Sequence, residues 1–558
     1  TAVGRDSLYK NVSGAYNVAL GSYAADKNIG GNNNVAIGYI TNRTNVDGDA
    51  NTAVGSQAMP VNTASSNTAI GYYASNCNTT GTGSVAVGYA AACAVATGSC
   101  NTAVGQNALR AAIAGTCRNV AIGNGALYNL EGNNTVAVGT CAGASSTTSN
   151  CSTWIGHFAG YANTTGDANT VLGHVALYNN TDGDSNIAIG TCSLWTNITG
   201  DNNVGIGVCA LYTNNAANNT AVGHHALKSN AAQSNTAVGY GALTDNTSGT
   251  VNTAIGENSL ANNTTGNCNV AMGRQAIFTN TTGSCNIAIG NNDFICNTVA
   301  NGNIAIGRTS LFCNITGADN VSIGSCASYC NLHGSQNIAI GRSALFKNTC
   351  SYNTAVGYSA MVCNTTGIWN AAVGYCAGSA ITTGGQNSLL GPYAGEQTAT
   401  GQQNTYLGFG AGRYNTCSNN IAIGHNAARC LANGSTTLAC ASSGVYIGDS
   451  VRGNADAEEN VIAIGYRACS CGSNTVSIGN GSITDNYFNG NITATGGLSA
   501  TGSCCSYFAG NVSIGTNTPS QELTVRGEVA TQNASGIQTV IVGNVSDDGA
   551  ICINNSGG

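Results

Sequence analysis

A short motif, Asn-x-Ala-(Val/Ile)-Gly, returns along this chain at a nearly constant interval, and this repeat limits the folds open to it. The glycines that end the motif or its variants lie at residues 4, 21, 38, 55, 71, 88, 105, 123, 139, 156, 173, 190, 207, 223, 239, 256, 273, 290, 307, 324, 341, 357, 374, 391, 408, 424, 448, 465 and 479. Nearly every step is 16, 17 or 18 residues; the exceptions are 24 residues from Gly424 to Gly448 and 14 into Gly479. A fixed short period is typical of a solenoid, in which each repeat is one coil stacked on its neighbours.

The residues within one repeat are those of a β-coil. Thr236-Ala237-Val238 is a short β-branched run, and Gly239 can adopt positive φ at a corner. Ala242-Leu243 supplies a second apolar step, and Asn246 to Gly249 supplies a return turn. Seventeen residues are too few for a strand and a helix, but enough for two strands and two turns. We therefore predict an all-β fold, a β-solenoid (β-roll) of about 29 coils over residues 1–479, with an insertion near 431–443.

Stacking turns each position of the repeat into a column along the solenoid. We expect the Val or Ile before each glycine, and the Leu four residues after it, to form the apolar interior. The Asn that opens each motif should form a ladder of side-chain amides. At roughly 4.8 Å per coil, the stack would be about 130 Å long.

The constant Ala two residues before each glycine lies on the opposite strand face from Val or Ile. A face left to solvent need not be so uniformly small, so we expect this face to meet the same face of identical chains around a threefold axis. The alternative is a monomeric solenoid whose narrow interior admits only Ala.

The composition excludes several classes of protein. Hydrophobic residues make up 42% and the formal charge is only −7, which disfavours disorder. The 16 Lys and Arg form no basic stripe for nucleic acid. No apolar run of 18 residues and no leader stand out, so we expect no membrane span. Because Thr1 opens in mid-repeat, we expect an upstream portion.

Several of the 25 cysteines recur at the period of one coil. Residues one coil apart have Cα atoms about 4.8 Å apart, within the range that a disulfide needs. Intercoil disulfides would imply an oxidising, extracellular location; the alternative is free cysteines that pack as small hydrophobes. The candidate pairs are Cys77 with Cys93, Cys100 with Cys117, Cys192 with Cys209, Cys268 with Cys285, and Cys296 with Cys313. Cys330 lies one further period after Cys313 and would make a column of three. Because the total number of cysteines is odd, at least one thiol stays unpaired within the chain.

The search for catalytic or metal-binding patterns is negative, so we predict no enzyme, no metal and no cofactor. His157 and His174 should stack on adjacent coils, where an outward polar position explains them better than a metal site. A glycan depolymerase would need paired carboxylates, typically about 5 to 10 Å apart. The candidates lie in turn-like or inserted segments and are Asp182 with Asp184, Asp47 with Asp49, and Glu458 with Glu459.

The position after each motif glycine is often aromatic. Tyr72 and Tyr89, and likewise Tyr358 and Tyr375, should be neighbours on adjacent coils. Such ladders can bind a receptor glycan, or they can pack between chains, which we favour. Triplets such as Asn78-Thr79-Thr80 and Asn364-Thr365-Thr366 fit the acceptor sequence for N-glycosylation. They recur, however, because the return turn of many coils is built from the same residue types.

After Gly479 the period fails, and we predict a β-rich connector over 480–510 and a β segment over 511–558. Residues 511–527, Asn-Val-Ser-Ile-Gly-Thr-Asn-Thr-Pro-Ser-Gln-Glu-Leu-Thr-Val-Arg-Gly, resemble a segment common in phage and large-virus tail-fibre proteins. The repeats resemble arrays in such fibres and, at a longer period, the β-roll heads of trimeric autotransporter adhesins. The resemblance implies a homotrimer on a virion or cell surface that binds a host glycan or receptor.

Three functions follow as hypotheses. The first is a trimeric virus or phage fibre, a stiff spacer for host attachment together with other virion proteins. The second is a cellular adhesin or surface-filament subunit. The third is a glycan depolymerase.

Overall fold

The computed structural model describes residues 1–112, 115–483, 512–514, 523–525, 528–533 and 536–541. It forms two units, Thr1–Ile483 and Thr484–Gly558. The described residues contain strands and turns but no helix. The strands are β1 (Ala2–Val3), β2 (Val18–Leu20), β3 (Val35–Ile37), β4 (Thr52–Val54), β5 (Thr68–Ile70), β6 (Val85–Val87), β7 (Thr102–Val104), β8 (Val120–Ile122), β9 (Val136–Val138), β10 (Thr153–Ile155), β11 (Thr170–Leu172), β12 (Ile187–Ile189), β13 (Val204–Ile206), β14 (Thr220–Val222), β15 (Thr236–Val238), β16 (Thr253–Ile255), β17 (Val270–Met272), β18 (Ile287–Ile289), β19 (Ile304–Ile306), β20 (Val321–Ile323), β21 (Ile338–Ile340), β22 (Thr354–Val356), β23 (Ala371–Val373), β24 (Ser388–Leu390), β25 (Thr405–Leu407), β26 (Ile421–Ile423), β27 (Ala441–Ser442), β28 (Val445–Ile447), β29 (Glu458–Glu459), β30 (Ile462–Ile464), β31 (Val476–Ile478), β32 (Val512–Ile514), β33 (Leu523–Val525), β34 (Glu528–Asn533) and β35 (Gly536–Ile541).

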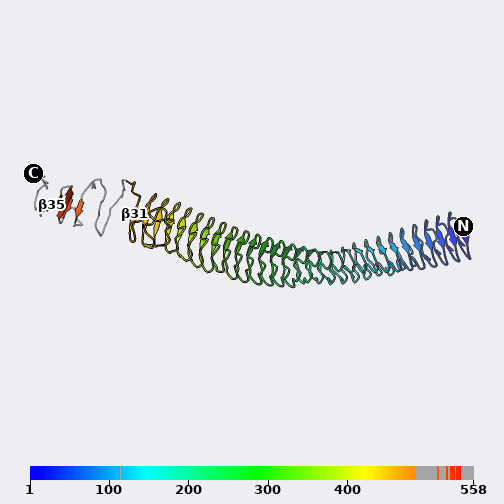
Figure 1. The fold of residues 1–558 in the computed structure, drawn as a ribbon. Coiled ribbons are helices and arrows are strands. Elements are labelled where there is room, and N and C mark those ends of the chain that lie inside the picture. Colours follow the sequence, from blue (N-terminus) through cyan, green and yellow to red (C-terminus); the bar gives the residue numbers. More distant parts are fainter. Residues whose placement is uncertain (113–114, 484–511, 515–522, 526–527, 534–535, 542–558) are drawn as a thin grey trace. The chain divides into compact units, whose positions relative to one another are not determined.

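The first unit is the predicted β-solenoid of about 28 turns, in which each coil contributes one short strand to a single 29-stranded parallel sheet (Figure 1). Each strand pairs with the strand one coil away at the same position of the repeat, as when Ala237 of β15 pairs with Ala254 of β16. The register does not slip between β1 and β31, even across the insertion, where β26 pairs directly with β28. The repeat of the sequence is therefore the repeat of the structure.

The interior of the solenoid is lined by the Ala column, and this corrects one prediction. The central strand residues Ala36, Ala53 and Ala103 are fully buried, while Ile70 and Leu172, at the ends of their strands, are 40% and 48% exposed. Because alternate strand residues face opposite sides, an inward Ala places its Val or Ile neighbours outside. The Leu column was predicted correctly, since Leu109 and Leu127 are buried. The uniform Ala thus reflects a narrow interior, the alternative that the sequence left open.

In the described coils a second strand forms only near the insertion, where β27 pairs with β29, and none forms at the Ala-Leu step. The Ala-Leu step lies in a turn, and its Leu has positive φ, as in Leu109 (52°) and Leu177 (49°). Backbone bonds between coils continue through this turn; the N–H of Leu109 donates to the carbonyl of Ala126 at 2.9 Å. Left-handed residues let the chain bend tightly around the Ala column, which an extended second strand would not.

Asparagine ladders satisfy the buried polar groups of the coil. The predicted ladder, called here the strand-side ladder, runs without interruption from Asn169 to Asn420. Within it the backbone N–H of Asn286 donates to Oδ1 of Asn269 at 3.0 Å, and Asn303 repeats the bond to Asn286. Each buried amide thereby bonds to the coil before it and the coil after it, which confirms the ladder.

A second buried ladder, the turn-side ladder, lies seven residues after the motif glycine and was not predicted. Asn263 Nδ2 donates to Oδ1 of Asn246 at 2.8 Å and to the carbonyl of Gly266 at 2.9 Å. In the 16-residue coils the two ladders come close enough to bond, as from Asn235 Nδ2 to Oδ1 of Asn230 at 3.3 Å. Differences in coil length are therefore absorbed in the return turn, between the two ladders.

Replacing Asn286 by Ala should lower the free energy of unfolding by roughly 1–3 kcal/mol, because the buried N–H of Asn303 loses its acceptor. Asn286→Ser should cost less. Ser84 occupies the same column, and its Oγ accepts the N–H of Asn101 at 3.2 Å. Urea denaturation followed by circular dichroism measures both; equal losses for Ala and Ser would contradict the role given to the ladder.

Trp154 and Tyr406 enter the Ala column in coils where the facing Leu has become Gly. Trp154 is fully buried at the centre of β10. A Cβ on Gly160 would lie 2.2 Å from its Cε3, and a Cβ on Gly143 2.8 Å from its Cδ1. Tyr406 in β25 lies in the same way against Gly412. Most coils have Ala in the strand and Leu in the turn, whereas these coils have a large residue in the strand and Gly in the turn. The two combinations fill a similar interior volume.

The second unit is described only in its strands. β32 pairs with β33 in parallel, and β34 pairs with β35 as an antiparallel ladder in which Glu528 faces Ile541. The predicted connector over 480–510 lies outside the described residues from 484 onward, as does much of the segment over 511–558.

Candidate functional surfaces

The first and third residues of the strands in the 29-stranded sheet form the outer sheet face, which is largely apolar and half-buried to exposed. Leu172 and Leu390 are 48% and 50% exposed on this face. The largest apolar patch on a typical monomer covers roughly 300–600 Å2. Here the apolar columns continue from β1 to β31, interrupted by threonines but by no charged side chain.

The predicted tyrosines lie in one exposed column, called here the outer aromatic column. Tyr72 and Tyr89 stack with ring centroids 5.8 Å apart, and Tyr358 and Tyr375 at 5.3 Å. His157 and His174 stack in the same column at 5.3 Å. Rings stacked in this way cover each other's faces, so a sugar ring approaching the column meets mainly edges and hydroxyl groups. This geometry favours packing of the column against another chain over stacking of a sugar on a ring face.

A second aromatic column lies five residues after the motif glycine and was missed. Tyr161, Tyr178, Trp195 and Tyr212 occupy four successive coils, with ring centroids 5.2, 6.4 and 5.1 Å apart. Phe312, Tyr329 and Phe346 form a shorter run at 5.0 and 5.1 Å. Aligning every position of the repeat, rather than the motif alone, would have revealed both runs.

The coil register places three of the five candidate cysteine pairs in common columns. The N–H of Cys209 donates to Thr191, that of Cys285 to Asn267, and that of Cys296 to Phe312, the contacts expected for equivalent positions on adjacent coils. These are the contacts of the pairs Cys192 with Cys209, Cys268 with Cys285, and Cys296 with Cys313.

The other two candidate pairs are offset by one residue. Cys77 donates its N–H to the carbonyl of Cys93 and so lies level with Ala94. Arg118, not Cys117, lies level with Cys100, because its N–H donates to Ser99. A spacing of 16 or 17 residues does not define a column when neighbouring coils differ in length.

All ten candidate cysteines carry free thiols in the structure. Burial raises the pKa of the Cys313 thiol to about 11, with Cys296 and Cys330 close by, so this thiol is protonated at neutral pH. Disulfide formation needs the thiolate. Oxidation at Cys313 would therefore have to draw on a small thiolate fraction. The predicted intercoil disulfides stay predictions.

One disulfide does join adjacent coils. Cys417 and Cys440 are bonded with a Cα–Cα distance of 5.0 Å, and they are equivalent positions on either side of the inserted loop. The N–H of Thr416 bonds to the carbonyl of Ala439 beside them. The bond fixes the stack where the insertion interrupts it.

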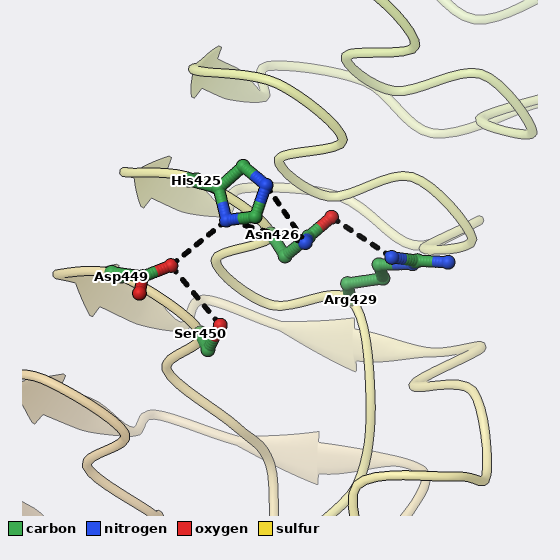
Figure 2. A network of polar contacts seen from close by, with 5 residues as sticks. All are labelled: His425, Asn426, Arg429, Asp449 and Ser450. Atoms are coloured by element: carbon green, nitrogen blue, oxygen red, sulfur yellow. Dashed lines mark hydrogen bonds and ion pairs between the residues drawn. The ribbon is translucent and has the colours of Figure 1, made fainter.

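A network of polar contacts spans the insertion (Figure 2). His425 Nδ1 lies 2.9 Å from Asp449 Oδ1, which also accepts a hydrogen bond from Ser450 Oγ at 3.0 Å. The hydrogen bond from His425 is the main cause that lowers the pKa of Asp449. Arg429 donates to Asn426 Oδ1 at 3.0 Å. Because Ser450 bonds to the carboxylate rather than to the imidazole, this is not the order of a catalytic triad.

Four of the six candidate carboxylates accept hydrogen bonds from neighbouring turns or coils. Asp184 Oδ1 accepts the N–H of Asp167 at 2.7 Å, and Asp49 Oδ1 accepts that of Asn32 at 2.6 Å. The hydroxyl of Thr165 is the largest cause that lowers the pKa of Asp182. Glu458 is buried and accepts the N–H of Ala455 at 2.7 Å. These contacts give the acidic groups a role in joining turns and coils.

Asp293 is buried in the interior at a position where most other coils have Ala or Ser. Its Oδ1 accepts the N–H of Ser310 at 2.9 Å, and its Oδ2 that of Gly307 at 3.2 Å. Burial outweighs these bonds and raises the pKa of Asp293 to about 7, from a usual value of 3.8.

Between these two pKa values the folded chain holds a proton that the unfolded chain has lost, so stability should fall as pH rises from about 4 to about 7. Asp293→Ser should therefore stabilise the chain at pH 8 and have less effect at pH 4. Thermal unfolding of both proteins across this range measures the difference. A pH-independent difference would contradict the buried-carboxylate explanation.

Within the described ranges, no group of three or more His, Cys, Asp or Glu side chains is arranged to hold a metal ion. No helix there is long and apolar enough to cross a membrane. No protein-family model, curated protein or solved structure matches the chain.

Proposed function

We propose that this chain is the structural rod of a fibre on a virion or cell surface, which assembles with copies of itself and carries or forms a host-attachment surface. The observation that supports it is the unbroken register of the parallel sheet from β1 to β31. Bending such a stack would strain the strand bonds, the turn bonds and two asparagine ladders at once. A continuous stack of this kind suits a spacer better than a catalytic domain.

Self-association rests on the outer sheet face, since the Ala column is buried within one chain. A partner that covers this face must repeat at the spacing of the coils, and a second copy of the chain meets that condition. The proposed assembly is a homotrimer with the outer sheet faces inward.

Native mass spectrometry with and without reductant tests this assembly. A trimer that survives reductant is expected, and a monomer would contradict the assembly. Leu172→Asp together with Leu390→Asp, on the outer sheet face, should weaken the trimer. Ile198→Asp is the matched control, because Ile198 is 44% exposed but lies in a turn.

Attachment is tested by binding of fluorescently labelled rod to candidate host cells, with and without prior removal of surface glycans. Loss of binding after glycan removal would support a glycan receptor. A cellular adhesin is the second candidate, and a membrane or cell-wall anchor in the full-length protein would favour it. Shortening of host polysaccharide by purified rod would contradict the structural proposal and support a depolymerase.

A further inference from the structure

The turn-side ladder contains acceptor sequences for N-glycosylation whose asparagines are buried. Eight triplets of the form Asn-x-Ser/Thr start at ladder asparagines that are at most 2% exposed. These asparagines are Asn78, Asn163, Asn197, Asn246, Asn263, Asn280, Asn314 and Asn364.

The side-chain nitrogens of these residues are already engaged. Asn280 Nδ2 donates one hydrogen to Oδ1 of Asn263 at 2.7 Å and the other to the carbonyl of Gly283 at 2.9 Å. Asn246 makes the same two bonds at 2.8 and 2.7 Å, and Asn364 at 2.7 and 3.0 Å. Asn78, Asn197 and Asn263 likewise make two bonds, so six of the eight asparagines donate both amide hydrogens inside the stack. Asn163 and Asn314 each donate one, to the carbonyls of Gly166 and Gly317.

Glycosyl transfer would remove one of these hydrogens. Nδ2 would lose a proton and form a bond to the sugar C1, while the bond from C1 to the diphosphate of the lipid carrier breaks. The product nitrogen keeps one hydrogen, so one of the two bonds is lost, and a sugar occupies a column that has no exposed surface. Glycans are bulky and belong on surfaces.

We infer that a glycan at these eight asparagines and the folded solenoid exclude each other, and that the chain therefore folds in a compartment without N-glycosyl transfer. In a secretory compartment the transferase acts on the unfolded chain, when all eight acceptors are accessible. A fibre assembled in a bacterial or eukaryotic cytosol avoids this conflict.

The hydroxyl residues of the eight triplets provide a matched variant. All eight side chains are exposed, so their removal leaves the buried ladder in place. They are Thr80, Thr165, Thr199, Ser248, Thr265, Thr282, Thr316 and Thr366, each to be replaced by Ala. The variant also carries Thr44→Ala and Ser322→Ala, because Asn42 and Asn320 start triplets of the same form and are fully buried. The triplet at Asn433 is left intact as an internal control, because Asn433 is exposed in the inserted loop and can carry a glycan on the folded chain.

The experiment directs the wild-type chain and the tenfold variant to the secretory pathway of eukaryotic cells, and produces both in the bacterial cytosol. The cytosolic proteins should both yield a protease-resistant rod, which shows that the variant folds. The secreted wild-type chain should carry glycans at ladder asparagines and lose protease resistance, and the variant should regain it. A protease-resistant rod with a glycan on Asn280, or a secreted wild-type rod that folds without ladder glycans, would overturn the inference.

Discussion

Trp154→Ala should lower the free energy of unfolding by about 3–5 kcal/mol, because it removes a fully buried indole from a coil whose facing position, Gly160, has no side chain to fill the space. Gly160→Leu alone should also destabilise, since its Cβ would lie 2.2 Å from the indole. Backbone strain is not the reason. Gly160 has φ of 57°, and Leu177 adopts 49° at the same position of its coil.

The double variant Trp154→Ala with Gly160→Leu recreates the usual pairing and should recover much of the stability lost in either single variant. Urea denaturation of the four proteins completes a double-mutant cycle. Additive losses, with no recovery in the double variant, would contradict the exchange of volume between these two positions.

Gly256→Ala should be comparably damaging, on the order of 3 kcal/mol or more, for a different reason. Gly256 has φ of 132°, a conformation that residues with a Cβ rarely adopt, and its Cβ would lie 2.4 Å from the carbonyl oxygen of Gly273 one coil away. The stack cannot relieve this contact without breaking its register.

Gly481→Ala is the control for this substitution, because a Cβ there meets nothing within 4 Å. Differential scanning calorimetry of both variants should show a lower melting temperature for Gly256→Ala and little change for Gly481→Ala. Equal melting temperatures would show that the corner glycines are not required for close stacking.

The period alone predicted the solenoid, the strand-side asparagine ladder and the outer aromatic column, because stacking turns each position of a repeat into a column. It could not decide which strand face is inside. Alternation separates Ala237 from Val238, but it does not say which of them faces the core, and that depends on the width of the interior.

Whether two candidate cysteines share a column depends on the local coil length. Cys268 and Cys285 share a column, whereas the coil after Cys100 is longer by one residue and moves Cys117 out of line. The turn-side ladder was overlooked because its asparagines were interpreted as turn and glycosylation residues. Trp154 was overlooked because its compensation lies on another wall of the coil.

Because variation in coil length is absorbed in the return turn, the strands keep their register whatever happens there. A whole coil can therefore be added or removed without shifting the register of the stack, and only the two flanking coils exchange a neighbour. The number of repeats sets the length of the solenoid. Duplication or loss of one short segment of the gene can therefore lengthen or shorten the molecule in steps of one coil.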